Sequence, residues 1–394
     1  MSNVLPISGK PAPASSSLNS IDEILTDLRA GRMVVIMDDE DRENEGDLIM
    51  AAESATPEAV AFMIRYTSGI ICVPMEEEGL LRLELPQMVQ ANSESHRTAF
   101  TVSVDMRIGT TTGVSSADRA ATILALADPN TAASDFARPG HIFPLRSRKG
   151  GVLVRAGHTE ASVDLCRLAG MKPIGVLCEV MNDDGSMARR PQLEAFAKRH
   201  NLKIGTISDL IRHRLRTERS VERISEQTVQ TDLGEFRLYG YEDRVSQEVH
   251  LALARGRVDG PEVPLVRVHL PETLRDLAGV HGPVGSTWTL RSAMQRIADA
   301  GCGVVVILRQ QESPRDLVDS IRALASAAQA AAQAAERAAK AEGGEGSVLR
   351  TFGVGAQILK DLGVRRMRVL SAPKQMHGIS AFDLEIEGYV GEDL

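Results

Sequence analysis

The sequence predicts a two-domain protein of the α/β (α+β) class. Its 394 residues are enough to bury two separate hydrophobic cores. As far as about residue 214, short apolar runs of the strand type alternate with segments that have the helical spacing of apolar residues, which indicates a mixed sheet with helices. After that point, three successive strand-like segments indicate a second α+β domain.

The first domain is expected to span residues 20–215, behind a Ser-, Pro- and Ala-rich tail at 1–19 that is expected to be disordered. A helix is predicted after the capping residue Ser20, and further helices where Ser, Thr or Pro precedes apolar residues three and four apart. These further helices cover residues 57–66, 115–127, 159–169, 191–200 and a segment from 208. Strands are predicted at 32–37, 48–52, 70–73, 99–104, 152–154, 174–180 and 204–207.

A charged linker at 216–223 is expected to join this domain to a second one at 224–394. The second domain is predicted to contain an Ala-rich insertion at 323–346. That segment is rich in helix-forming residues and poor in large apolar ones, so we expect an exposed helix or a mobile arm. The predicted strands of this domain are 224–231, 235–241, 246–253, 263–269 and 304–308.

Composition and charge narrow the functional classes. The net charge of -8, the pI near 5.7 and the 3% aromatic content disfavour a nucleic-acid binder. No apolar run approaches the ~20 residues that span a bilayer, and the N-terminus has no secretory signal pattern, so we expect no membrane association. The four cysteines form no C-x-x-C pair, which disfavours a zinc finger and suits the reducing cytoplasm, where we expect the protein.

The acidic run at 38–47 lies between two predicted strands. Its carboxylates repel one another, so a positive partner is needed, and Arg42 or a divalent metal could provide it. A solvated acidic turn is the alternative interpretation.

Two further segments place polar residues before helices or in turns. Residues 110–119 carry threonines and Gly113 before a helix, where backbone N–H groups and hydroxyls could hold a phosphate, or could simply cap the helix. The turn at 138–141 could present His141 to a cleft, although a lone histidine of this kind is often a surface residue.

At 155–161 a strand is predicted to end in Arg155 and a helix to begin at Thr159. Arg155, Thr159 and the helix start could bind a phosphate, while His158 is free to bind a metal. The H-x-E spacing of zinc deaminases also occurs here, but their P-C-x-x-C segment does not. Glu179 ends an apolar strand, where it either turns to solvent or, if buried, suits general acid–base chemistry.

Together these segments resemble one family, the 3,4-dihydroxy-2-butanone 4-phosphate synthases of riboflavin biosynthesis. The resemblance covers about residues 20–215, and the order, spacing and identity of the motifs agree. The motifs are DDEDRENEGD at 38–47, SGIIC at 68–72, TTGVSSADR at 111–119, RPGHIFPLR at 138–146, RAGHTEASVDL at 155–165, and GVLCE with NDDGSMAR through residue 189.

The resemblance implies a lyase that converts D-ribulose 5-phosphate to L-3,4-dihydroxy-2-butanone 4-phosphate and formate. It implies two Mg²⁺ or Mn²⁺ ions per site, with Glu43 and His158 as metal ligands. It implies proton transfer by His141 and Glu179, supporting roles for Glu45 and Cys72, and a homodimer whose interface forms the site. The implied substrate contacts are Arg42, Glu43, Asp47, Arg155, Ala156, Gly157, His158, Thr159 and Glu179.

The second half resembles GTP cyclohydrolase II at 231–243, 250–256, 263–270 and 352–370. That family binds zinc through three cysteines after the strand VRVH, but residues 271–291 contain no cysteine here. We therefore expect no zinc and a domain that keeps the fold without the hydrolase activity. One alternative is a bifunctional enzyme with an altered GTP site. Another is a non-catalytic protein whose second half binds a nucleotide or a partner.

Overall fold

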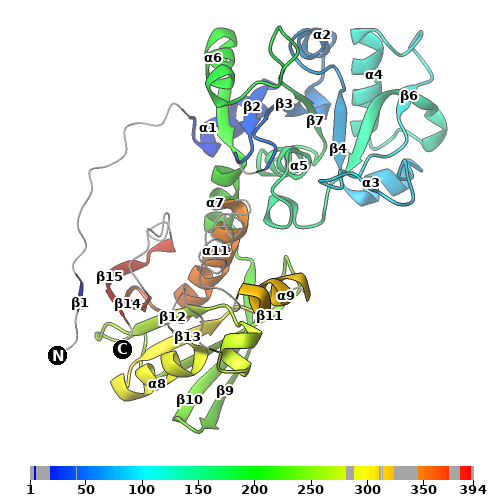
Figure 1. The fold of residues 1–394 in the computed structure, drawn as a ribbon. Coiled ribbons are helices and arrows are strands. Elements are labelled where there is room, and N and C mark those ends of the chain that lie inside the picture. The colour runs from blue at the N-terminus through cyan, green and yellow to red at the C-terminus, as the bar shows by residue number, and fades with distance from the viewer. Residues whose placement is uncertain are drawn as a thin grey trace. The chain divides into compact units, whose positions relative to one another are not determined.

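The computed structural model describes residues 4–5, 18–40, 42–280, 288–309, 312, 314–323, 345–371 and 382–391. It divides the chain into two compact units (Figure 1). The N-terminal unit comprises residues 13–213, and the C-terminal unit comprises residues 214–394 with residues 1–12. Each unit has one mixed sheet with helices, which confirms the fold class predicted from the sequence.

A seven-stranded mixed sheet forms the centre of the N-terminal unit, in the order β5-β6-β4-β7-β3-β2-β8. Strand β3 pairs antiparallel with β2 and β7, whereas β2 with β8 and β4 with β6 are parallel pairs. The apolar runs of β2 and β3 are buried along their whole length, as expected for central strands covered on both faces. The strands are β2 (Val34–Met37), β3 (Gly46–Ala51), β4 (Cys72–Met75), β5 (Val104–Met106), β6 (Phe136–Arg146), β7 (Gly175–Glu179) and β8 (Lys203–Thr206).

Helices pack on this sheet through alternate strand residues. Val35, Leu48 and Val176 form one core with side chains of α2, α4 and α6. Helix α5 contacts β3, β4 and β7, and α1 contacts β2 and β8. The helices are α1 (Ile21–Arg29), α2 (Pro57–Tyr66), α3 (Glu77–Arg82), α4 (Ser116–Ala127), α5 (His158–Leu168), α6 (Arg190–His200) and α7 (Ile207–Thr217).

Two strand predictions in this unit are wrong in part or in full. Residues 152–154 do not form a strand, because Gly150 and Gly151 adopt positive φ and turn the chain into a 3₁₀ helix at Gly151–Leu153. The carboxylate of Asp164 stabilises that turn by accepting a hydrogen bond from the Val152 N–H at 2.8 Å. In the predicted strand at 99–104, only Val104 belongs to a regular strand.

The C-terminal unit contains an eight-stranded sheet in the order β1-β15-β14-β12-β13-β11-β10-β9. Strands β9 to β11 pair antiparallel in succession, as predicted, and β12 to β15 form a parallel group. The strands are β1 (Val4–Leu5), β9 (Val221–Thr231), β10 (Gly234–Asp243), β11 (Val249–Arg255), β12 (Leu265–His269), β13 (Gly303–Ile307), β14 (Arg366–Leu370) and β15 (Glu385–Val390). The helices are α8 (Leu290–Ala300), α9 (Pro314–Ala323) and α11 (Glu345–Asp361), with a π-helical turn at Thr273–Leu277.

The expected linker at 216–223 contains the end of α7 and the beginning of β9, so residues 218–220 alone lie between these elements. Most of the expected disordered tail, residues 1–3 and 6–17, lies outside the described residues, while Val4–Leu5 pairs with β15. Residues 324–344 of the expected Ala-rich insertion also lie outside them. No helix in the described ranges has the length and apolar character needed to cross a bilayer.

Candidate active site

Strands β2, β3 and β7 bring acidic residues to one place in the N-terminal unit. Asp38 follows the end of β2, Asp47 lies in β3, and Glu179 is the last residue of β7. In the strand register, Asp47 lies directly opposite Glu179. Both side chains point to the face covered by α5, because the alternate positions Leu48 and Cys178 belong to the core on the other face.

Helix α5 begins at His158, a buried residue that is 5% exposed. Its Nε2 lies 3.2 Å from the carbonyl oxygen of Ile36 on β2, so Nε2 carries the hydrogen and donates it. In the neutral ring, the lone pair is then on Nδ1. This atom lies 3.7 Å from Glu43 Oε2 and 3.8 Å from Asp47 Oδ1. A ring nitrogen that faces two carboxylates while the other nitrogen is held by a carbonyl is typical of a metal-binding histidine.

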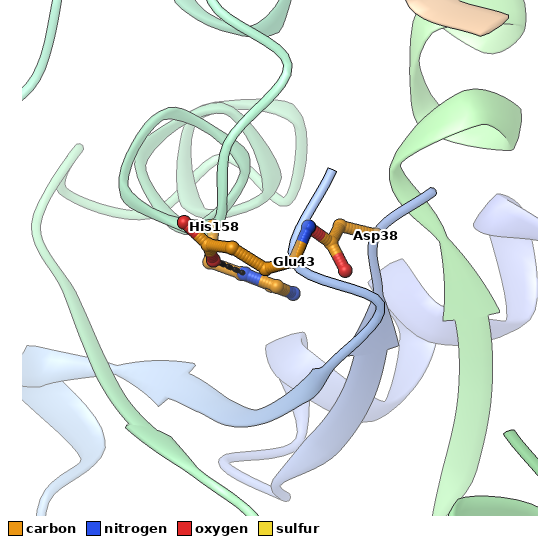
Figure 2. Close-up of side chains that lie close together, drawn as sticks. All are labelled: Asp38, Glu43 and His158. Atoms are coloured by element: carbon orange, nitrogen blue, oxygen red, sulfur yellow. Dashed lines mark hydrogen bonds and ion pairs between the residues drawn. The ribbon is translucent and has the colours of Figure 1, made fainter. Parts of the chain in front are cut away.

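The residues present fit a divalent cation. One ligand atom each from Asp38, Glu43 and His158 lies within 4.8 Å of the other two (Figure 2). Beside them, Asp47 Oδ1 is fully buried and has no hydrogen-bond partner among the described residues. A buried carboxylate oxygen without a donor is unfavourable, and a cation or a substrate hydroxyl would remove that cost.

Asp38 organises the acidic loop. Its side chain is fully buried, Oδ2 accepts hydrogen bonds from Arg42 Nη1 and the Glu43 N–H, and Oδ1 accepts one from the Glu45 N–H. Both oxygens accept hydrogen bonds from the loop, so Asp38 fixes the conformation of the loop that carries Glu43. The sequence left Asp38 without a role, although an acid at the end of a buried strand and ahead of several free N–H groups is a recognisable signal.

Arg189 is a second residue that sequence reasoning missed. It follows the turn after β7, and its Nη1 donates to the carbonyl oxygens of Glu43, at 2.5 Å, and of Asn44. The same atom lies 3.8 Å from Glu45 Oε1. Arg189 thus binds carbonyl groups of the acidic loop from another segment of the chain, while Asp38 accepts hydrogen bonds within the loop.

The charges of the site shift its pKa values strongly. Burial favours a raised pKa for Glu43, but the His158 ring and the Arg42 guanidinium outweigh it and lower the pKa to about 2. Burial raises the pKa of Asp47 to about 8, with the His158 ring opposing the shift. Burial favours a lowered pKa for His158, but the carboxylates of Asp47 and Glu43 outweigh it and raise the pKa to about 9. Without a cation, this group of residues therefore holds a proton near neutral pH.

Arg42 and Arg155 meet next to Gly157. A Cβ at Gly157 would come too close to the guanidinium of Arg155, so the glycine makes room for the two arginines. Arg42 contacts Asp38 and Glu43, each at 2.9 Å. Arg155 donates to Glu160 Oε2 at 2.8 Å and to Thr98 Oγ1 at 3.1 Å.

A cavity of about 390 Å³ lies beside Arg155 and Thr159. Five basic and two acidic side chains contribute to its lining, so its charge suits an anion. The lining residues are Glu77, Arg97, Ala99, Arg146, Ser147, Arg148, Lys149, Val154, Arg155, Thr159 and Glu160.

The remaining predicted residues lie at different distances from this centre. Glu179 Oε2 accepts a hydrogen bond from Ser68 Oγ at 2.7 Å. Cys72 is buried, and burial raises the pKa of its thiol well above the ordinary range, so the thiol stays protonated. His141 is not brought to the group, since its strand β6 is three places from β3, or ~14 Å at the usual strand spacing. Ala156 lies half-buried in the turn before α5.

The C-terminal unit holds a histidine–aspartate pair where a zinc site would follow strand β12. His269 Nε2 lies 2.9 Å from Asp276 Oδ2, and both residues are largely buried. Asp276 also accepts hydrogen bonds from the N–H groups of Glu272 and Leu290. Within the described part of this unit, no three His, Cys, Asp or Glu side chains converge as metal ligands would.

Comparisons with known proteins agree with both halves of this description. Residues 22–213 match the family model of 3,4-dihydroxy-2-butanone 4-phosphate synthase, and residues 222–391 match that of GTP cyclohydrolase II. A Pseudomonas aeruginosa protein named 3,4-dihydroxy-2-butanone 4-phosphate synthase is 53% identical over 95% of this chain and 99% of its own length. An Arabidopsis thaliana protein named bifunctional riboflavin biosynthesis protein RIBA 1 is 48% identical over 96% of this chain and 69% of its own length.

Two solved structures are also similar. A two-domain 3,4-dihydroxy-2-butanone 4-phosphate synthase from A. baumannii has a TM-score of 0.79 and 39% identity, over 95% of this chain and all of that chain. A 3,4-dihydroxy-2-butanone 4-phosphate synthase in complex with two magnesium ions has a TM-score of 0.50 and 47% identity, over 51% of this chain and 98% of that one. This chain therefore belongs to the 3,4-dihydroxy-2-butanone 4-phosphate synthase family of riboflavin biosynthesis, as a two-domain member with a GTP cyclohydrolase II-like second domain.

Proposed function

We propose that the N-terminal domain, residues 20–215, converts D-ribulose 5-phosphate to L-3,4-dihydroxy-2-butanone 4-phosphate and formate. The observation that carries this proposal is the environment of His158. Its Nδ1 faces the carboxylates of Glu43 and Asp47 while Nε2 is held by Ile36, and the buried Asp47 Oδ1 has no donor in the described ranges.

Glu43 and His158 would hold Mg²⁺ or Mn²⁺, two ions per site, with substrate oxygens completing the coordination. The structure that is similar over this domain is a complex with two magnesium ions, which supports the proposed metal. A bound cation supplies positive charge that stabilises an enediolate after a C–H bond next to a ketone loses its proton. No zinc is proposed for either domain.

The chain's own residues supply the remaining functions. Arg155 and Thr159, which contribute to the lining of the basic cavity, would bind the substrate phosphate. The residues between them, Ala156 to His158, would also contact the substrate. Asp47 would accept a hydrogen bond from a sugar hydroxyl, and Arg42 would stabilise the anionic sugar while holding Glu43 in place.

Glu179 and His141 would transfer protons. Glu179 stands opposite Asp47 beside the metal residues, whereas His141 lies on a distant strand of the same chain. A homodimer in which a second copy presents His141 would complete the site. We expect this dimer to be cytoplasmic.

For the C-terminal domain, residues 224–394, we propose a non-catalytic role. The chain has a single cysteine, Cys302, in this half, and it is buried with its thiol against the carbonyl oxygen of Arg257. Three thiolates for a zinc ion therefore cannot assemble. The alternative is a bifunctional enzyme, which the name of the Arabidopsis relative favours.

One experiment tests both proposals. Purified chain is incubated with Mg²⁺ and ribulose 5-phosphate, and formate is measured, beside a reaction with GTP and a zinc determination. We expect formate from the parent and none from Glu43→Ala or His158→Ala, with no GTP turnover and no stoichiometric zinc. Lack of formate from the parent would overturn the synthase proposal, and GTP turnover would establish the bifunctional alternative.

A further inference from the structure

A second polar cluster surrounds His141, away from the group at Glu43 and His158. His141 lies on β6 and Asp105 on β5, and these strands pair antiparallel. The His141 backbone N–H donates to Asp105 Oδ1 at 2.8 Å, and the ring Nδ1 lies 2.7 Å from Asp105 Oδ2. An ionised carboxylate can only accept hydrogen bonds, so Nδ1 carries the hydrogen. In the neutral ring, Nε2 then holds the lone pair.

A base that is held by a carboxylate needs an accessible ring and a buried carboxylate, and the side chains of His141 and Asp105 differ in this way. The Asp105 side chain is 12% exposed, whereas the His141 side chain is 45% exposed. Among the described residues, no Lys or Arg forms an ion pair with the Asp105 carboxylate. His141 is the single side chain in these ranges that could pair with it as a cation. The carboxylate is therefore committed to this ring, and Nε2 is left accessible at the surface.

The motif at 111–119 explains how the carboxylate is held. Asp118 accepts hydrogen bonds from the Thr111 N–H and hydroxyl and from the Gly113 N–H, which fixes the turn before α4. This turn presses Gly113, at φ +83°, against Asp105, and a Cβ at Gly113 would overlap the carboxylate oxygen Oδ2. The motif thus forms a wall behind Asp105.

We propose that Asp105 is the positioning residue of His141, and that the glycine-containing turn at 111–118 holds Asp105 in place. This inference rests on the proposed proton transfer by His141. In that transfer, a substrate proton moves to Nε2, its bonding electrons stay on the substrate, and the same nitrogen returns the proton to a later intermediate. Nδ1–H remains on Asp105 throughout, so the ring keeps one orientation and one tautomer.

The first test uses Asp105→Asn, which keeps the shape and still accepts the backbone N–H. The Asn amide can place N–H groups toward Nδ1 and so favours the wrong tautomer, for which we expect kcat to fall about a hundredfold or more with little change in KM. Long-range ¹H–¹⁵N spectra of histidine-labelled protein read the tautomer directly, and His141→Gln identifies which of the nine histidines is observed. We expect hydrogen on Nδ1 in the parent and on Nε2 in the variant.

The second test compares two glycines of similar backbone conformation. Gly109 and Gly113 have φ of +80° and +83°, but a Cβ at Gly109 would meet nothing within 4 Å. Gly113→Ala should lower kcat at least tenfold by displacing Asp105, while Gly109→Ala carries the same backbone strain and should leave kcat within about threefold.

The outcomes separate this inference from the proposed function. If His141→Gln keeps turnover, the proposed role of His141 is wrong, whatever its tautomer. If His141→Gln abolishes turnover while Asp105→Asn keeps kcat within about threefold of the parent, only the positioning role is overturned. Equal losses in Gly109→Ala and Gly113→Ala would overturn the role of the turn.

Discussion

Asp47 and Glu179 are directly paired residues on the antiparallel strands β3 and β7, so their side chains stand together on the face covered by α5. Glu179 receives a hydrogen bond from Ser68, whereas Asp47 Oδ1 is buried without a donor in the described ranges. Two neighbouring carboxylates of this kind are stable together only when a proton or a cation offsets their charge. The pair therefore links the stability of the domain to pH and to metal.

The first prediction concerns Asp47→Asn in metal-free protein. The pKa of Asp47 is raised from 3.8 to about 8, so the unfolded chain releases this proton at a lower pH than the folded chain does. The contribution to the free energy of unfolding is complete below pH 3.8 and is lost as pH rises toward 8. Asn carries no such proton, so the stability of the variant relative to the parent should increase with pH.

Urea unfolding of both proteins with EDTA at pH 5 and pH 8 measures this difference. It should grow by up to about 1.4 kcal/mol per pH unit within the window. A difference that stays constant between these pH values would show that Asp47 is ionised throughout.

The second prediction concerns proton release on metal binding. The carboxylates of Asp47 and Glu43 raise the pKa of His158 to about 9, so the ring is protonated at neutral pH in the metal-free protein, whereas a metal ligand must be neutral. Mg²⁺ binding at pH 7 should therefore release at least one proton, and the affinity should rise at least about tenfold per pH unit below pH 8. Calorimetry in buffers of different ionisation enthalpy counts the protons. Binding without proton release would place the cation away from His158.

Site residues could be predicted from the sequence where they directly follow a strand or begin a helix. The acidic run after an apolar strand and His158 at the start of a helix could be recognised locally, and the structure brings Glu43 and His158 within 3.7 Å. The pairing of Asp47 with Glu179 could not be read in this way, because it joins strands more than a hundred residues apart.

The residues that sequence reasoning missed have a similar cause. Asp105 lies one residue beyond the predicted strand at 99–104, and its contact with His141 depends on the pairing of β5 with β6. The strand predicted at 152–154 failed because two successive glycines adopt positive φ, a backbone choice that their identity permits but does not require. Arg189 was part of a recognised motif, but only the fold shows that it reaches the acidic loop.

The third prediction concerns Ser68→Ala. The variant loses the hydroxyl that donates to Glu179 Oε2, and a hydrogen bond to a charged group contributes about 1.5–3 kcal/mol. We expect kcat to fall roughly tenfold to a hundredfold in the formate assay, because Glu179 loses its fixed orientation. Ser246→Ala in the other domain loses an equivalent hydroxyl-to-carboxylate hydrogen bond, to Asp243, and should leave kcat unchanged. Equal kcat values for the two variants would contradict a role for Ser68.

The fourth prediction concerns the neighbouring arginines Arg189 and Arg190. Arg189 donates to the backbone carbonyls of Glu43 and Asn44, whereas Arg190 forms a half-exposed ion pair with Glu194 within α6. A single atom, Nη1, donates to both carbonyls, and a lysine side chain is too short to place its ammonium nitrogen where Nη1 lies. Arg189→Lys should therefore release the acidic loop and weaken Mg²⁺ binding about tenfold to a hundredfold.

Arg190→Lys replaces a guanidinium one residue away and serves as the control. It should change Mg²⁺ affinity by less than about twofold, because the ion pair of Arg190 with Glu194 lies away from the loop. Surface ion pairs of this kind contribute at most ~1 kcal/mol to stability. Calorimetric titration of both variants with Mg²⁺, alongside their unfolding curves, separates loosening of the loop from general destabilisation. Unchanged Mg²⁺ affinity in Arg189→Lys would mean that Asp38 alone, through its three loop hydrogen bonds, is sufficient to hold Glu43 in place for the metal.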